Sequence, residues 1–157
     1  DPDSVNLVAA LHHSLMAYEY QITKAKVRVE FLPEQTPMVL SQHVQLTQIL
    51  NSLLSNAVEA MDRGGTLTLK IEPINAQRVS LVVSDTGKGM TEEQRRMAFR
   101  PFFTTKQGGL GVGLVLVKRI MERFGGTVTL NSHEGEGTSV RLSFTLVAPE
   151  KGMNSPR

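Results

Sequence analysis

The segment from residue 85 to residue 114 limits most strongly what this chain can fold into. It reads DTGKGM, then FRPFFTTK, then GGLGVGL, which runs directly into an apolar stretch. Asp85 ends an alternating run in which Val79, Leu81 and Val83 are apolar, so we expect its carboxylate at the end of a β-strand. Glycines directly before a helix let backbone N–H groups converge on phosphate oxygens. The segment therefore predicts a nucleotide site, with the base at Asp85 and the phosphates at the second glycine cluster, residues 108–113.

Each of these motifs has a plainer explanation when it is taken alone. Asp85-Thr86-Gly87 could be only a turn that ends a strand, and the glycines of residues 108–113 could be only a flexible loop. The cluster is neither the GxGxxG of dinucleotide-binding folds nor the GxxxxGK[ST] of P-loop proteins. The order of the motifs, rather than any one of them, favours a nucleotide site.

A further component lies upstream, in a helix that the apolar periodicity predicts over residues 42–62. Ser52, Asn56 and Glu59 follow one another at i, i+4 and i+7, so they line one side of this helix. An asparagine carbonyl is a hard oxygen ligand, suited to a Mg²⁺ ion that also holds phosphate oxygens. A polar stripe alone more often marks the solvated face of an amphipathic helix.

The remaining patterns predict one α+β domain over residues 1–148 and a polar, disordered tail over residues 149–157. Strands and helices do not alternate strictly, so we expect a two-layer sandwich rather than a parallel α/β fold. The predicted elements are a helix over residues 5–24, strands at 27–31 and 38–40, a hairpin of 67–71 and 79–83, a short helix from Thr91 to Ala98, a helix over 112–124 that is apolar nearly all round, and a hairpin of 128–130 and 140–146.

The composition excludes several kinds of site. The chain has no cysteine, so it holds neither a disulfide framework nor a thiolate zinc site. A formal charge of +2 without a basic run gives no support for nucleic-acid binding. With no signal peptide and no apolar run of about 18 residues, we expect no direct membrane contact and a cytoplasmic location.

Together with NSLLSNAVEAM upstream, the order of these motifs resembles the ATP-binding domain of bacterial sensor histidine kinases. The wider superfamily also contains DNA gyrase, Hsp90 and MutL. The resemblance covers residues 5–146 and looks closest to the nitrogen-sensor type, because of NAVEAM, PFFTTK and the short lid. It implies the Bergerat ATP-binding fold, in which a mixed, mostly antiparallel sheet of about five strands is backed by three helices.

The resemblance also implies which residues hold the cofactors, ATP and Mg²⁺. Asn56 would be the metal ligand, and Asp85 would recognise adenine. Residues 99–103 would anchor a loop over the site, and the second glycine cluster would bind the phosphates. The cofactor-binding residues implied in this way are Asn56, Asp85, Gly87, Gly89, Thr105, Lys106, Gly109, Gly111, Gly113, Leu114 and Thr138.

One position departs from the family, which usually has a further asparagine where this chain has Ser52. In the gyrase-like ATPases the corresponding residue is a glutamate that activates water, and a serine cannot replace it as a general base. The departure argues against an efficient hydrolase and leaves the strength of magnesium binding open.

No histidine of this chain fits the pattern of a phosphoacceptor, which has an acidic residue after it and a proline nearby. His13, for example, is followed by Ser14-Leu15-Met16. We therefore assign no catalytic residue within this chain and expect His12, His13, His43 and His133 to be structural or surface residues.

The resemblance implies transfer of the ATP γ-phosphoryl group to a histidine on a separate dimerisation domain of the same protein. It also implies a response-regulator receiver domain as partner. We expect the whole protein to be a homodimer, either cytosolic or anchored in a membrane with this part in the cytosol, and this chain alone to be monomeric. The alternatives are a regulatory nucleotide-binding module without phosphotransfer and an ATPase of the gyrase or Hsp90 kind.

Overall fold

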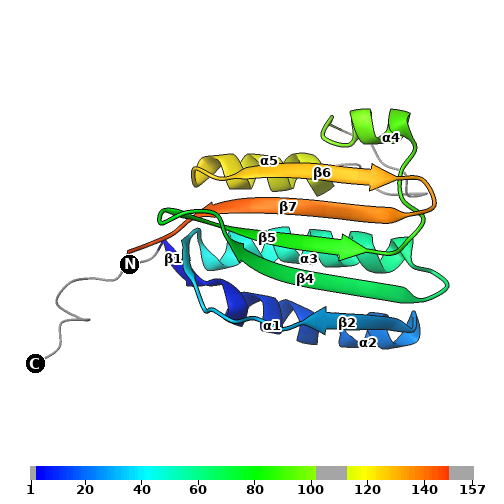
Figure 1. Cartoon of the computed structure of the whole chain (residues 1–157), viewed down its shortest axis with the longest axis horizontal. Helices are drawn as coiled ribbons and strands as arrows, with labels where there is room; N and C mark the ends of the chain where they lie inside the picture. Colours follow the sequence, from blue (N-terminus) through cyan, green and yellow to red (C-terminus); the bar gives the residue numbers. More distant parts are fainter. Residues whose placement is uncertain (1–2, 102–112, 149–157) are drawn as a thin grey trace, which may run out of the picture.

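Two layers, a sheet and a set of helices, make up the part of the chain that the computed structural model describes, residues 3–101 and 113–148 (Figure 1). The elements are β1 (Ser4–Asn6), α1 (Leu7–Ala17), α2 (Glu19–Lys24), β2 (Val27–Phe31), β3 (Met38–Leu40), α3 (His43–Ala60), β4 (Gly65–Pro73), β5 (Arg78–Asp85), α4 (Glu92–Met97), α5 (Gly113–Arg123), β6 (Thr127–His133) and β7 (Gly137–Thr145). The predicted tail, residues 149–157, lies outside the described residues.

The main sheet has five strands in the order β2-β4-β5-β7-β6. Only the β2–β4 pair is parallel, and the other three pairs are antiparallel. The long helices α1, α3 and α5 lie against one face of this sheet (Figure 1). The prediction of an α+β sandwich with a mixed, mostly antiparallel sheet backed by three helices is confirmed.

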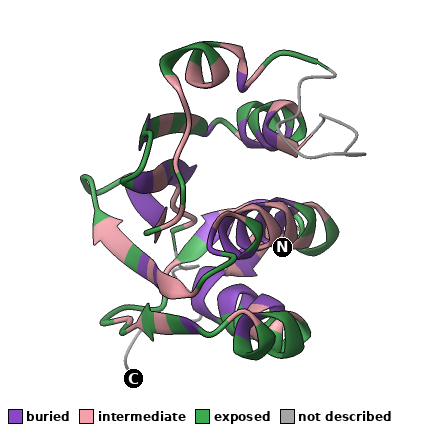
Figure 2. Ribbon diagram, turned by 90° about the vertical axis from the view of Figure 1, so that its right-hand side faces the viewer, coloured by how far each residue is buried: buried purple, intermediate pink, exposed green. Residues whose placement is uncertain are grey.

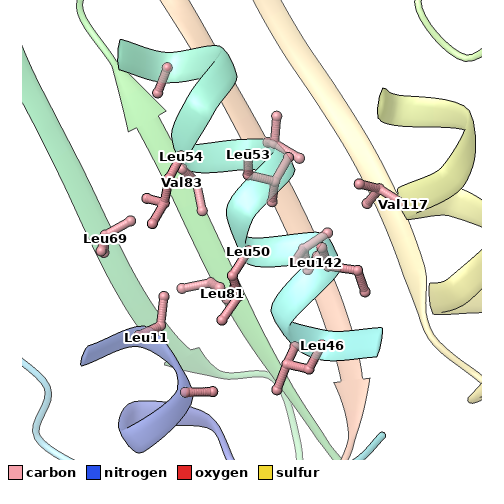
Figure 3. Close-up of a cluster of buried hydrophobic side chains, with 14 of the residues drawn as sticks. Leu11, Leu46, Leu50, Leu53, Leu54, Leu69, Leu81, Val83, Val117 and Leu142 are labelled. Carbon is pink, nitrogen blue, oxygen red and sulfur yellow. The ribbon is translucent and has the colours of Figure 1, made fainter. Parts of the chain in front are cut away.

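The core lies between the sheet and α3, which is the middle helix. Figure 3 shows the leucines of α3 directed at Leu81 of β5 and Leu142 of β7, with Leu11 of α1 and Val117 of α5 on either side. Figure 2 shows that the buried residues gather between the two layers. This packing fixes α3, which carries Asn56, relative to the strand that ends at Asp85.

The predicted helix over residues 5–24 is wrong in one respect, because the structure divides this segment into three elements. Val5 belongs to β1, which pairs with β3, and the Asn6 side chain then caps α1 by accepting a hydrogen bond from the Ala9 N–H (3.0 Å). Tyr18 ends α1 with a non-helical backbone, and α2 begins at Glu19. Neither glycine nor proline marks these breaks, so the apolar periodicity ran through them.

The prediction that the helix over residues 112–124 is apolar nearly all round is also wrong. In α5, Leu114, Val117, Ile120 and Met121 are buried, whereas the charged residues of its second half are exposed. The helix is therefore amphipathic, with one face on the core. By contrast, the prediction that Thr91 caps the short helix is confirmed, because α4 has a capping box formed by Thr91 and Gln94.

Within residues 3–101 and 113–148, no helix is both long and apolar enough to cross a membrane.

The placement of α3 can be tested with Leu50→Ala, because the Leu50 side chain is 0% exposed between α3 and the sheet. Removing it leaves a cavity, so we expect the free energy of unfolding to fall by about 2–5 kcal/mol. The matched control is Leu32→Ala, since Leu32 is 90% exposed, and its effect should stay within about 0.5 kcal/mol. Urea denaturation followed by circular dichroism measures both, and similar losses in the two variants would contradict this placement.

Candidate nucleotide-binding site

Three neighbouring strands bring polar side chains together at one end of the sheet. In the strand register, Asp85 of β5 lies opposite Thr138 of β7, and Thr138 lies opposite Ser132 of β6. Alternation along each strand places all three on the helix-covered face, since Val83 and Val140, two residues from Asp85 and Thr138, belong to the core. This row of side chains forms the base end of the candidate site.

The Asp85 carboxylate is held by the backbone through one of its two oxygens. Its Oδ1 accepts hydrogen bonds from the Gly87 N–H (2.9 Å) and the Thr138 N–H (3.2 Å). Burial raises the pKa of Asp85, and these two hydrogen bonds oppose the rise by favouring the charged form. Among the described residues, no hydrogen bond engages Oδ2. The geometry thus fixes the carboxylate and leaves one oxygen to accept a hydrogen bond from a ligand.

The loop after Asp85 packs closely between the end of α3 and the β6–β7 hairpin. The Lys88 N–H donates to the Ala60 carbonyl at the end of α3 (3.0 Å), and a side chain at Gly87 would collide with that carbonyl. Gly89 has a φ of +69°, and a side chain there would collide with the backbone carbonyl of His133. The two predicted glycines therefore keep the loop close to its neighbours, which supports their assignment to the base end.

The other end of the candidate site lies where α5 begins beside α3. A Cβ atom at Gly113 would lie 3.1 Å from Ser52 Oγ and 3.8 Å from Asn56 Nδ2. The first turn of an α-helix has backbone N–H groups without intrahelical partners and a partial positive charge. The Leu114 side chain is buried in the core, so Leu114 can contact a nucleotide only through its backbone. Asn56, Gly113 and the N–H groups of α5 are thus placed together.

Part of the predicted site cannot be placed. Thr105, Lys106, Gly109 and Gly111 lie outside the described residues. Phe99, which begins the predicted aromatic anchor, is half-buried against the core, and Lys118 Nζ lies 5.9 Å from its ring centroid. This contact ties the segment after α4 to α5.

The residues around Asn56 fit a magnesium ion that is held mainly by phosphate and water. Asn56 is half-buried, and its side chain makes no hydrogen bond within the described part of the chain. No group of three or more histidine, aspartate or glutamate side chains in that part could hold a metal ion by itself. Mg²⁺ commonly binds through one or two protein oxygens together with substrate phosphates, so an Asn56 carbonyl beside the phosphate end is a suitable ligand. The four histidines are exposed at the surface, as predicted.

Sequence reasoning missed Ser132, the third residue of the row at the base end. Ser132 is 3% exposed and forms hydrogen bonds to three different partners. The available signal was its position in an alternating strand, because Val128 and Leu130 predict that residue 132 also faces inward. A polar residue at an inward position needs hydrogen-bond partners.

Comparison with known proteins identifies the family. Residues 41–148 match the family described as histidine kinase-, DNA gyrase B-, and HSP90-like ATPase. The chain belongs to this family. Because the domain of this family binds ATP, the match supports ATP as the nucleotide of this chain, as the sequence predicted.

The relatives narrow the family to sensor histidine kinases. Sensor histidine kinase ZraS of Salmonella typhi is 32% identical over 149 residues, which cover 94% of this chain and 32% of that protein. The catalytic domain of histidine kinase ThkA has a TM-score of 0.81 and 26% identity, covering 90% of this chain and 95% of that one. Full-length ShkA in complex with AMPPNP has a TM-score of 0.77 and 26% identity, covering 92% of this chain and 31% of that one.

The chain is thus homologous to the ATP-binding catalytic domains of sensor histidine kinases, which confirms the resemblance found in the sequence. It spans about a third of the length of curated relatives such as ZraS. The nitrogen-sensor subtype stays a prediction.

The burial of Asp85 predicts that Asp85→Asn stabilises the nucleotide-free protein at pH 7. Because the folded-state pKa lies above the unfolded one, the folded protein holds more protons between the two values, and the free energy of unfolding falls as the pH rises through that window. Asparagine carries no charge and retains Oδ1, so the variant should melt at a higher temperature. Its advantage should disappear as the pH falls below the ordinary pKa of an aspartate, about 4.

Scanning calorimetry without nucleotide measures this difference between pH 3 and pH 8. Glu72→Gln is the matched control, because Glu72 is a half-exposed carboxylate on the same sheet. A lower melting temperature for Asp85→Asn at pH 7 would show that the charged carboxylate stabilises the fold.

Proposed function

We propose that this chain is the ATP-binding catalytic domain of a two-component sensor histidine kinase. The proposal rests on the arrangement of the two ends of the candidate site, the base end at Asp85 and the phosphate end at Asn56 and Gly113. A fixed carboxylate lies at the end of the sheet, and a helix N-terminus lies beside Asn56, in a chain homologous to the catalytic domain of ThkA. One end suits a base and the other suits phosphates, so the arrangement suits a nucleoside triphosphate.

Asp85 supplies the preference for adenine. A carboxylate oxygen accepts a hydrogen bond from the 6-amino group of adenine, whereas the 6-oxo group of guanine would bring two acceptors together. Because Oδ1 is already engaged by Gly87 and Thr138, Oδ2 is the oxygen available for this contact.

At the other end, Asn56 binds Mg²⁺, and the first N–H groups of α5 contact phosphate oxygens. The ion offsets the charge of the triphosphate and of the transferring phosphoryl group. Ser52, whose hydroxyl lies close to Gly113, replaces the asparagine usual in the family and leaves Asn56 as the protein ligand. Thr105, Lys106, Gly109 and Gly111 complete the phosphate site in this proposal.

The reaction transfers the γ-phosphoryl group to a histidine nitrogen on the dimerisation domain of the same protein. A P–N bond forms, the bond to the β-phosphate oxygen breaks, and ADP leaves. The chain's own contribution is positioning and charge neutralisation. The phosphoryl group is then transferred to the receiver domain of a response regulator. We place the ATP-binding domain in the cytoplasm, as part of a homodimeric sensor.

Ser52 argues against the ATPase alternative, since it cannot activate water as a glutamate would. A regulatory module that binds nucleotide without transferring phosphate differs from the proposal in one observable. The kinase domain phosphorylates its dimerisation domain, and the regulatory module does not.

Nucleotide recognition by Asp85 is tested by calorimetric titration of the protein with Mg-ATP. We expect Asp85→Asn to weaken binding by about tenfold or more, because an amide nitrogen replaces the acceptor of a charged hydrogen bond. Glu72→Gln removes a negative charge from the same sheet without touching the site and should bind like the wild type. Equal affinities for wild type and Asp85→Asn would remove the adenine role.

Phosphotransfer is tested by mixing the chain with its parent protein's dimerisation domain and radiolabelled ATP. We expect label on the acceptor histidine, and little hydrolysis or labelling by the chain alone. Asn56→Ala should lower the labelling rate by at least about tenfold, as expected when a ligand of the charge-neutralising ion is lost. Tight Mg-ATP binding without any labelling would favour the regulatory module.

A further inference from the structure

The Ser132 side chain is buried at the base end, but Thr138 lies between it and Asp85 in the row. We therefore assign the direct contact with the base to Asp85 and not to Ser132. Its Oγ accepts a hydrogen bond from the Met90 N–H (2.9 Å) and donates one to the Gly137 carbonyl (3.1 Å). It also lies 2.8 Å from Thr138 Oγ1. Ser132 therefore contacts both the hairpin turn and the loop that follows Asp85.

The direction of the hydrogen bond between Ser132 and Thr138 follows from counting protons. A hydroxyl has one proton to donate and two lone pairs to accept with. Ser132 gives its proton to the Gly137 carbonyl and uses one lone pair for Met90. For all three contacts to be hydrogen bonds at the same time, Thr138 is the donor in the remaining one, and this uses its own proton. What Thr138 Oγ1 can still offer to a neighbour is acceptor lone pairs.

Thr138 is also the direct neighbour of Asp85. The two residues are opposite each other in the register, and the Thr138 N–H holds Asp85 Oδ1. Side chains opposite each other in a sheet have Cβ atoms about 4.5–5.5 Å apart. Asp85 and Thr138 are therefore neighbouring side chains, and both Asp85 Oδ2 and Thr138 Oγ1 remain available as acceptors, because the Thr138 hydroxyl directs its proton at Ser132 Oγ.

A closed series of contacts holds this arrangement in place. It leads from Asp85 through the loop to Met90, across to Ser132, on to Thr138 and back to Asp85. The Gly135 N–H donates to the Lys88 carbonyl (2.7 Å) and ties the hairpin turn to the loop a second time.

We propose that Ser132 is a specificity-determining positioning residue of the ATP site. By accepting hydrogen bonds from the Thr138 hydroxyl and from the Met90 N–H, it makes Asp85 Oδ2 and Thr138 Oγ1 a fixed pair of acceptors that selects purines with a 6-amino donor over those with a 6-oxo acceptor. The inference rests on the proposed binding of adenine at Asp85.

Loss of the Ser132 hydroxyl has two consequences for binding. Thr138 can rotate and donate its proton, so a 6-oxo purine meets one donor and one acceptor in place of two acceptors. The loop also loses its bond at Met90, so the adenine contact becomes less well positioned. In Ser132→Ala we therefore expect the dissociation constant for ATP to rise about fivefold and the preference for ATP over ITP to fall by about threefold or more, as for the loss of one hydrogen bond.

The experiment is calorimetric titration of the whole chain with Mg-ATP and with Mg-ITP, at a temperature where each variant is folded. Ser80→Ala is the matched control, because Ser80 is a buried serine of the same sheet whose partners, the Glu72 carbonyl and Arg141, lie away from the base end. It should lose stability but keep both affinities within about twofold of the wild type. If Ser132→Ala does not fold, Ser132→Cys keeps the shape with weaker hydrogen bonds and carries the same comparison.

An ATP-to-ITP preference that is unchanged in the Ser132 variant, or changed equally in Ser80→Ala, overturns the role of Ser132. Asp85→Asn separates this failure from that of the proposed function. If the wild type binds ATP and Asp85→Asn does not, adenine recognition stands and only the role of Ser132 falls. If Asp85→Asn binds ATP as the wild type does, both fall together. A double variant should show less than additive losses, because Ser132 acts through the neighbour of Asp85.

Discussion

The packing of α3 on the sheet is the interaction on which the rest of the structure depends. Its leucines fill the space between the two layers, and α1 and α5 pack on either side of it. The same helix carries Asn56 on its α5 side and ends at Ala60, whose carbonyl holds the loop after Asp85. Hydrophobic burial therefore sets the separation between the base end and the phosphate end, although no leucine of α3 is assigned to the nucleotide.

The base end contains a partly buried charge that is unfavourable for folding, and the packing of the hydrophobic core compensates for it. Burial of Asp85 disfavours its charged form, and among residues 3–101 and 113–148 two backbone hydrogen bonds to one oxygen oppose that cost. We expect a fold without this charge to be more stable, but it would lose the acceptor to which we assign the discrimination between an amino group and a carbonyl group. The leucine core of α3 makes such a cost tolerable in a single domain.

The parts of the fold that follow simple periodicity were predictable from the sequence. The alternation of Leu67 to Ile71 and of Val79 to Val83 predicted β4 and β5, and glycines marked the ends of α3 and α5. The break at Tyr18 was not predictable, because neither a proline nor a glycine marks it in the sequence. Asp85 and Asn56 were predicted as site residues from their local context, whereas the proposal for Ser132 requires knowledge of the strand register. Each of the three strands contributes one polar residue to the hydrogen-bond network, so the sequence of any single strand gives little indication of it.

The two ends of the candidate site are built from different layers, and this division has a consequence for protein engineering. Asp85, Thr138 and Ser132 come from β5, β7 and β6, whereas Asn56 and Gly113 come from two helices. Base preference could therefore be redesigned in the strands while the helices to which we assign metal and phosphate binding stay intact. We expect a domain changed in this way to accept an unnatural purine triphosphate that other ATP-dependent enzymes in the same cell do not use.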